Sequence, residues 1–413
     1  MQLWKILKEV IKLDKLKTPY YLIDKEELNG NFEKMKNDFK SEWNNLIIGY
    51  SFKTNSLPWV INFFKEKGAY AEVVSKAEYK LAKYLGYNLN RIIYNGPIKS
   101  EETFIEALEN SAIVNIDSFQ EIEWIKKNIP NTSKKWKIGI RINFDLESYC
   151  PGETSCGLRG GRFGFNYENG EVLKAINELK KIEYVKINGI HLHNSTKTRS
   201  LNIYKNLAKM AVRLKELFPL EIEYIDIGGG FFGGLENKPQ YIDYAKIISE
   251  ELKKNFSSDV YLIIEPGAAL IASPISFVSK VISIKQVKEN RIATIDGSCN
   301  NLNPLMRNKS YFYEIYSDKK DKQIKDKQIV AGYTCMENDI LLNLENEKEL
   351  LVGDLIRFNK VGSYTSTLSP LFIEYFPDVI VKDNGKYFYA RKEWEVEEFI
   401  QKNYVENEKE IMS

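Results

Sequence analysis

The segment that decides the fold reads Leu46-Ile47-Ile48-Gly49-Tyr50-Ser51-Phe52-Lys53-Thr54-Asn55. It is a short apolar run that closes on a single amine, Lys53, and a helix-length stretch follows it. An apolar run of this length predicts a buried strand. A strand followed by a helix is the repeating unit of parallel α/β folds, so recurrence of the pattern would define the architecture.

The pattern recurs seven more times. Further apolar runs lie at residues 69–74, 91–94, 112–116, 136–142, 185–193, 223–227 and 261–265. Helices are expected between them at residues 56–67, 76–85, 118–128, 171–179, 200–218 and 240–255. Eight such units over about 225 residues predict an α/β fold, a (β/α)8 TIM barrel, whose active site lies at the C-terminal ends of the strands.

The pattern of apolar and polar residues changes after Pro274. Short β-type runs at residues 278–284, 291–295, 329–333, 355–358 and 387–389 are separated by polar turns. This pattern predicts a second, mostly antiparallel β domain, a barrel or sandwich. The expected division is an N-terminal segment (1–24) that packs on the C-terminal domain, a barrel (25–274) and a β domain (275–413). The lysine-rich stretch 317–328 is expected to be a solvated loop or hairpin tip.

Composition excludes several classes of protein. The 59 basic and 57 acidic residues nearly cancel and form no basic block, so nucleic acid is not an expected partner. No apolar run could span a bilayer, and the charged opening, residues 1–10, lacks the core of a secretory signal. The four cysteines form no CxxC pair. We therefore expect a cytoplasmic protein with free thiols, no metal site and no membrane partner.

If the barrel is an enzyme, residues at the strand C-termini carry the chemistry. These positions hold Lys53, Glu72, Arg141, His193, Gly228-Gly229-Gly230 and Glu265-Pro266-Gly267. An amine at a strand mouth can be desolvated enough to lose its proton near neutral pH, as a Schiff-base lysine must. The alternative is a lysine whose head is simply solvated.

The other strand ends suggest partners for such a lysine. His191 and His193 are the only histidines and lie two residues apart, so both point to one side of their strand. His193, at the mouth, is the better functional candidate, although a buried structural histidine is the alternative. The glycine run exposes backbone N–H groups that can bind a phosphate, or serves a tight turn. A carboxylate at Glu265 could keep a pyridine nitrogen protonated.

In this order, the motifs resemble the fold-type III pyridoxal-phosphate decarboxylases, which include diaminopimelate, ornithine, arginine and carboxynorspermidine decarboxylases. The matching motifs are Tyr50-Ser51-Phe52-Lys53-Thr54-Asn55, Gly189-Ile190-His191-Leu192-His193, Asp226-Ile227-Gly228-Gly229-Gly230-Phe231, Glu265-Pro266-Gly267, Tyr333-Thr334-Cys335-Met336-Glu337-Asn338-Asp339, Gly353-Asp354 and Gly362-Ser363-Tyr364-Thr365. The resemblance implies an alanine-racemase-like barrel, pyridoxal 5'-phosphate as cofactor and α-decarboxylation of an amino acid. It also implies a homodimer with active sites at the interface.

Carried over position by position, the resemblance implies that Lys53 forms the Schiff base, that His193 stacks on the cofactor ring and that Glu265 meets its nitrogen. Cys335 matches a thiol that protonates the substrate carbon across the dimer interface, although a small core residue is the alternative. The remaining cofactor contacts are assigned to Glu72, Arg141, Ser195 or Thr196, Gly229, Gly230, Gly267 and Tyr364. The remaining substrate contacts are assigned to Asp296, Asn303, Glu337 and Asp339.

The chain departs from the family pattern at positions where the family binds the substrate side chain and the cofactor phosphate. Ala268 and Asn303 stand where diaminopimelate enzymes carry arginine, and Met336 stands where the family has an acid. We therefore expect a substrate other than free diaminopimelate, with diaminopimelate decarboxylase as the alternative. A racemase shares the architecture but usually places arginine where this chain has Glu265. A non-catalytic cofactor carrier would lack the β domain.

Overall fold

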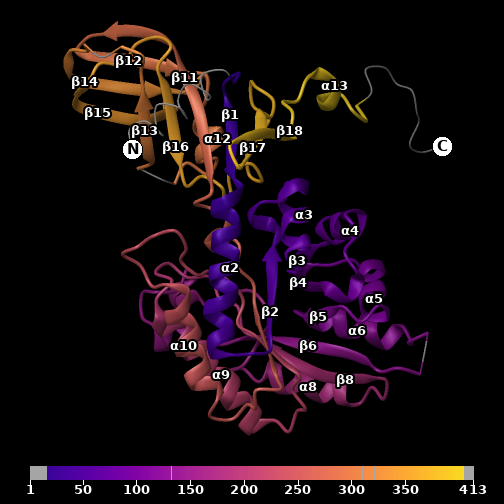
Figure 1. Ribbon diagram of the computed structural model, residues 1–413. Coiled ribbons are helices and arrows are strands. Elements are labelled where there is room, and N and C mark those ends of the chain that lie inside the picture. The colour runs from indigo at the N-terminus through magenta and orange to yellow at the C-terminus, as the bar shows by residue number, and fades with distance from the viewer. Residues whose placement is uncertain (1–15, 132, 308–309, 320, 404–413) are drawn as a thin grey trace. The chain divides into compact units, whose positions relative to one another are not determined.

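The computed structural model describes residues 16–131, 133–307, 310–319 and 321–403 (Figure 1). Its contacts divide the chain into two units, Asn29–Ile271 and a second formed by Met1–Leu28 with Ala272–Ser413. The expectations for residues 1–15 lie outside the described residues. Among the described residues, no helix has the length and apolarity needed to cross a bilayer.

The first unit is a closed parallel barrel. Its strands are β2 (Leu46–Ser51), β3 (Tyr70–Ser75), β4 (Ile92–Ile98), β5 (Ile113–Ile116), β6 (Trp136–Asn143), β8 (Val185–His191), β9 (Tyr224–Asp226) and β10 (Tyr261–Ile264). Each strand pairs in parallel with the next, and β10 pairs with β2 to close the ring. A short strand, β7 (Phe165–Asn166), extends β6. The predicted eight-stranded barrel is confirmed.

Helices connect the barrel strands (Figure 1). The connecting helices are α3 (Pro58–Glu66), α4 (Lys76–Tyr84), α5 (Glu101–Glu109), α6 (Phe119–Lys127), α8 (Glu171–Lys180), α9 (Leu201–Leu217) and α10 (Tyr241–Leu252), and α2 (Lys25–Glu42) precedes the first barrel strand. The six expected helices are confirmed; α2 and α5 were not expected. The side chain of Ser100 caps α5 by accepting a hydrogen bond from the N–H of Thr103, which satisfies a donor that a helix start leaves free.

Tyr224, the first residue of β9, packs inside the barrel against Ile93 and Ile263. Its side chain is 5% exposed, and the two nearest glycines, Gly139 and Gly189, leave room for the ring. A Cβ on Gly189 would lie 1.9 Å from Cζ of Tyr224, and one on Gly139 would lie 2.0 Å from its hydroxyl oxygen. Because protein interiors are close-packed, the tyrosine ring leaves room only for glycine at these two positions.

The second unit is a β domain. Its strands are β1 (Tyr20–Asp24), β11 (Ile275–Val287), β12 (Asn290–Ile295), β13 (Phe312–Tyr316), β14 (Ile324–Ala331), β15 (Ile340–Lys348), β16 (Leu355–Asn359), β17 (Asp378–Asp383) and β18 (Lys386–Arg391). Among the described strands, the pairs β1–β17 and β12–β14 are parallel and the other pairs are antiparallel. The mostly antiparallel character is confirmed.

One prediction for this unit is half wrong. The stretch 317–328 was expected to be a solvated loop or hairpin tip, and its described residues up to 323 lie outside any strand, but β14 begins at Ile324 and pairs with β15. Lys325 lies opposite Glu347, and Lys327 lies opposite Glu345. Opposite charges across a strand pair stabilise it, so these charged residues favour the strand once the partner is present.

Candidate active site

Lys53 lies directly after strand β2. The strand ends at Ser51, and Lys53 sits in a single 3-10 turn, Phe52–Thr54. Its Nζ donates to Oγ of Ser51 (2.7 Å) and to Oε2 of Glu72 (2.8 Å), and its side chain keeps 37% exposure. The amine is therefore held at the barrel mouth beside a buried carboxylate, with one side open to a ligand.

A chain of hydrogen bonds crosses the barrel below Lys53. Nδ2 of Asn95 donates to Glu72 (3.2 Å) and to Oε1 of Glu265. Nδ2 of Asn115 donates to Oδ1 of Asn95 (2.8 Å), and the hydroxyl of Tyr224 donates to Oδ1 of Asn115 (2.7 Å). The two asparagines were not assigned from sequence. The available signal was a polar residue inside an apolar run for Asn115 and directly after such a run for Asn95.

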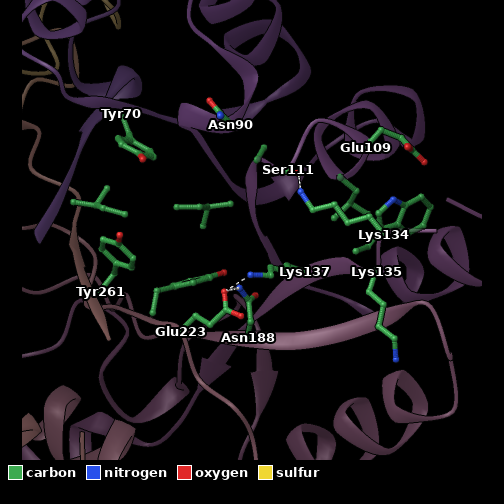
Figure 2. Close-up of a pocket in the computed structure, with 16 residues that line it drawn as sticks. Tyr70, Asn90, Glu109, Ser111, Lys134, Lys135, Lys137, Asn188, Glu223 and Tyr261 are labelled. Atoms are coloured by element: carbon green, nitrogen blue, oxygen red, sulfur yellow. Dashed lines mark hydrogen bonds and ion pairs between the residues drawn. The ribbon is translucent and has the colours of Figure 1, made fainter. Parts of the chain in front are cut away.

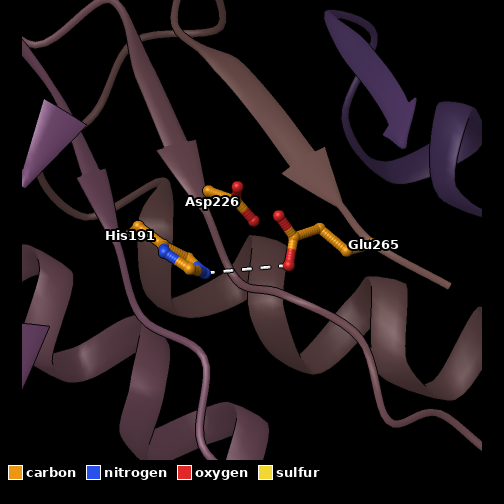
Figure 3. A group of neighbouring side chains, drawn as sticks. All are labelled: His191, Asp226 and Glu265. Atoms are coloured by element: carbon orange, nitrogen blue, oxygen red, sulfur yellow. Dashed lines mark ion pairs between the residues drawn. The ribbon is translucent and has the colours of Figure 1, made fainter. Parts of the chain in front are cut away.

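His191, Asp226 and Glu265 meet at the end of this chain (Figure 3). Nε2 of His191 lies 3.7 Å from Oε2 of Glu265, and Oδ1 of Asp226 accepts from the N–H of Gly228 (2.8 Å). Burial raises the pKa of Asp226 well above its usual value, and the charge of Glu265 raises it further. Asp226 is therefore the protonated member of the carboxyl pair.

Glu265 carries the negative charge of that pair. Burial alone would raise its pKa, but His191, a hydrogen bond from Asp226 and the charge of Lys53 outweigh burial and place the pKa below the usual range. Among the described residues, no lysine or arginine forms an ion pair with Glu265. A buried anion of this kind fits a cationic ring nitrogen.

His193 follows strand β8 and is neutral. Burial, reinforced by the charge of Arg141, lowers its pKa to about 3. Its ring is nearly parallel to that of His191, at 7° and 6.4 Å between centroids, which confirms that both point to one side. Arg141 ion-pairs with Asp117 (3.3 Å) and donates to the carbonyl of His193 (3.3 Å), so it fixes the backbone of this histidine.

The glycine loop after β9 packs tightly against the segment after β10. A Cβ on Gly229 would lie 2.1 Å from the carbonyl oxygen of Glu265, and one on Gly267 would lie 2.0 Å from Oγ1 of Thr54. Gly230 has φ +89°, a left-handed value that favours glycine. Larger residues would push this backbone away from the mouth. The loop can therefore offer N–H groups to a phosphate.

The loop after β8 carries the other assigned phosphate contacts. Ser195 is exposed and Thr196 is half-buried. Thr196 forms an isolated antiparallel bridge with Thr154, and the carbonyl of Ser195 accepts from the N–H of Ser155 (2.9 Å). Two loops of the barrel thus hold each other at this edge of the mouth.

In the second unit, three assigned residues are exposed: Cys335, Glu337 and Tyr364. Cys335 and Glu337 lie on the turn between β14 and β15. Tyr364 is 43% exposed and has φ +57°, uncommon for a residue with a side chain.

The other three assigned residues are bound within their own unit. Asp339 is 2% exposed and accepts from the N–H of Cys299 (2.8 Å) and from Oγ1 of Thr334 (2.6 Å). Asp296 accepts from the hydroxyls of Thr18 (2.6 Å) and Ser279 (2.6 Å). The buried Asn303 accepts from the N–H of Arg307 (3.0 Å). These contacts hold loops of the β domain together.

A cavity of about 310 Å³ lies at the opposite end of the barrel (Figure 2). Its lining includes Ile47, Tyr70 and Ile113 from the first residues of their strands, together with Tyr224. In a barrel of this kind the chemistry lies at the strand C-termini. The cavity is therefore separate from the site around Lys53.

Fold and site together define a pyridoxal-phosphate enzyme built on an α/β barrel. Residues 26–272 match the family model described as pyridoxal-dependent decarboxylase, pyridoxal binding domain, so the chain belongs to this family. Its activity is pyridoxal-phosphate-dependent decarboxylation of an amino acid.

Relatives of known identity support this assignment. The diaminopimelate decarboxylases of Methanocaldococcus jannaschii and Helicobacter pylori are each 28% identical, over 85% and 86% of this chain and 83% and 87% of their own lengths. The M. jannaschii enzyme solved with L-lysine has a TM-score of 0.85 at 25% identity, covering 96% of this chain and 94% of its own. The H. pylori enzyme with L-lysine has a TM-score of 0.80 at 24% identity, covering 96% and 98%.

Proposed function

We propose that the barrel mouth decarboxylates an amino acid at its α-carbon and that Lys53 is the residue to which the cofactor attaches. The observation that carries this proposal is the pairing of two features: an accessible amine beside Glu72, and a buried anionic Glu265. The bound cofactor supplies an electron sink for the carbanion that remains when carbon dioxide leaves.

The chain's own residues bind and orient around this chemistry. Glu265 holds a proton on the ring nitrogen, because a buried anion favours the charged form of its neighbour. The neutral imidazole of His193 can stack on the cofactor ring without placing a second positive charge beside the protonated ring nitrogen. Gly230 and Gly267 direct backbone N–H groups to the phosphate. The N–H of Gly229, also assigned to the phosphate, instead donates to Nδ1 of His193 (3.3 Å). Glu72 accepts the proton that Lys53 must lose.

Cys335 protonates the substrate carbon from the partner subunit of a homodimer. Support comes from its exposure on a turn that also carries Glu337. Further support comes from large apolar side chains exposed after Tyr364, namely Leu368, Leu371, Phe372 and Ile373. Exposed apolar surface of this kind is typical of subunit interfaces.

The substrate differs from free diaminopimelate. Asp339 and Asn303 are occupied inside the β domain, which leaves Glu337 as the exposed acid of its turn to meet a distal amine. The alternative function is that of a diaminopimelate decarboxylase, the enzyme named for the relatives above. A racemase is disfavoured by the anion at Glu265.

The four cysteines are free thiols, in keeping with a reducing compartment, the cytoplasm.

The barrel domain covers residues 25–274 and the β domain covers 275–413. Of the segment 1–24, residues 20–24 add strand β1 to the β domain through pairs with β11 and β17. This division leaves the site around Lys53 entirely on the barrel.

The test is covalent attachment of the cofactor. Borohydride reduction of the purified protein should fix pyridoxal phosphate to the peptide that contains Lys53, and Lys53→Ala should abolish both the label and decarboxylation. Lys67→Ala is the control, because this half-buried lysine pairs with Glu33 (3.6 Å) and lies over the ring of Phe63, away from the barrel mouth. A label retained in Lys53→Ala would sink the assignment.

A further inference from the structure

A row of buried charged side chains runs from the end of strand β4 to His193. We call its members, Lys99, Glu121, Asp117 and Arg141, the charge row. Their side chains are 0%, 4%, 6% and 8% exposed. Lys99 follows β4, Asp117 follows β5, Glu121 lies in the first turn of α6 and Arg141 lies in β6. Of the four, only Arg141 has an assigned role, so the other three call for an explanation.

Each member of the charge row contacts the next. Nζ of Lys99 lies 2.9 Å from Oε1 of Glu121, and Oε2 of Glu121 accepts from the N–H of Asp117 (2.7 Å). Oδ1 of Asp117 pairs with Nη1 of Arg141 (3.3 Å). Nη2 of Arg141 donates to the carbonyl of His193 (3.3 Å). Polar contacts therefore connect Lys99 to the backbone of the histidine without a gap.

Lys99 also holds the end of its own strand. Its Nζ donates to the carbonyl of Gly96 (2.7 Å). Gly96 has φ +82°, and a Cβ there would lie 2.7 Å from the carbonyl oxygen of Val74 in β3. Because Gly96 packs this closely on the neighbouring strand, Lys99 ties the C-terminal ends of two strands to the charge row.

A plainer explanation is that Glu121 only caps α6. An acid in the first turn of a helix that accepts from a backbone N–H stabilises the helix start. An exposed glutamate would serve as well, whereas here the carboxylate and the ammonium of Lys99 are both withdrawn from water, which is costly. Burial raises the pKa of Glu121 and the charge of Lys99 opposes that rise, so the carboxylate depends on the lysine to remain ionised. Capping alone does not require such a pair.

We propose that Lys99 and Glu121 are positioning residues for His193. The hydrogen bond to Glu121 fixes Asp117 where the chain turns from β5 into α6, and Asp117 in turn orients the guanidinium of Arg141. That guanidinium holds the carbonyl of His193. The inference rests on the proposed function, because it takes the imidazole of His193 to stack on the cofactor.

The test measures the dissociation constant of the full-length protein for pyridoxal 5'-phosphate by equilibrium dialysis, which needs no substrate. Lys99→Met with Glu121→Met removes the pair and the acceptor for Asp117 without leaving a buried charge unpaired. A stacked ring contact is worth about three- to tenfold in binding, so this double variant should bind the cofactor more weakly by that factor. Lys99→Met with Glu121→Gln keeps an oxygen that accepts from Asp117 and should bind like the wild type.

His193→Ala shows whether the effect passes through the histidine. Alone, it should weaken cofactor binding. Added to Lys99→Met with Glu121→Met, it should give no greater loss than His193→Ala alone, because changes that remove the same contact do not add. Losses that multiply, or wild-type binding by the Lys99→Met, Glu121→Met protein, would overturn the proposal. If that protein does not fold, Asp117→Asn takes its place in the same comparison, with the same expected and contradicting results.

The control is Lys322→Met with Asp354→Met. This buried pair in the β domain (2.5 Å) is matched, because Asp354 also accepts from a backbone N–H, that of Leu351 (2.7 Å). Cofactor binding should not change. A loss as large as that of the Lys99/Glu121 variant would reveal a general effect of removing a buried pair and would also overturn the positioning role. If instead borohydride fixes no cofactor to Lys53 in the wild type, the proposed function itself has failed.

Discussion

Replacing Glu265 by glutamine removes one buried negative charge and leaves the shape of the side chain almost unchanged. The carboxylate is 5% exposed, so its interaction with a cationic ring nitrogen is poorly screened. At about 4 Å and an effective dielectric constant of about 20, two unit charges interact by about 4 kcal/mol. Loss of that interaction lowers the pKa of the ring nitrogen by about three units and slows decarboxylation about a thousandfold.

The assay measures kcat for carbon dioxide release together with borohydride-fixed cofactor and the melting temperature. We expect Glu265→Gln to keep cofactor on Lys53 and to lose turnover. Glu251→Gln is the control, because Glu251 is also buried but pairs with Lys254 away from the mouth. Turnover of Glu265→Gln within tenfold of the wild type would show that this carboxylate does not sustain the electron sink.

Three other predictions follow from the structure. Cys335→Ala and Lys53→Ala should each be inactive, yet an equal mixture should regain about a quarter of wild-type turnover if sites are shared across a twofold dimer; no recovery on mixing would refute a shared site. The depressed pKa of His193 means that the unfolded chain binds a proton below about pH 6.5 that the folded chain refuses until about pH 3. The free energy of unfolding should therefore decrease as the pH is lowered from about 6.5 to about 3, and His193→Gln should flatten the slope that urea titrations at several pH values measure. An unchanged slope would contradict a neutral His193 ring in the folded chain. Gly189→Ala should lower the melting temperature by overpacking the barrel, whereas Gly30→Ala, which meets nothing within 4 Å in helix α2, should stabilise by about 0.5–1 kcal/mol; the reverse order would refute the packing argument.

The barrel could be predicted from sequence because its strands are largely buried on both faces and read as mostly apolar runs, in which polar residues such as Lys137 and Asn188 are few. Strand β15 was not predicted, because only its first half, with Leu341, Leu342 and Leu344, is apolar and its second half is charged. Its residues Glu345 and Glu347 become favourable only opposite the lysines of β14, and a single run of sequence does not reveal its partner.

The site residues that could be predicted are those whose side-chain chemistry and place at a strand end are visible in the sequence. Residues that belong to the site only because folding brings distant parts of the chain together could not be predicted. Lys53, His193 and Glu265 stand at strand ends and were assigned from position. Asn95 lies 170 residues from Glu265 in sequence yet donates to it, and no local pattern shows that contact. Asp339 was an acid in a family motif, but its burial follows only from the folded loop.

The hydrogen bonds below Lys53 have a direction. An ionised Glu265 can only accept, so Asn95 must turn its amide nitrogen toward it and its oxygen toward Asn115. Asn115 must then turn its own oxygen toward Tyr224, whose hydroxyl donates and stays protonated because burial raises its pKa well above the usual value. Glu72 accepts from the same nitrogen of Asn95, so two carboxylates set the polarity of every group down to the residue that lines the cavity at the far end of the barrel. Only neutralising both Glu72 and Glu265 would release the two amides to flip, and the barrel would then lose its single internal orientation.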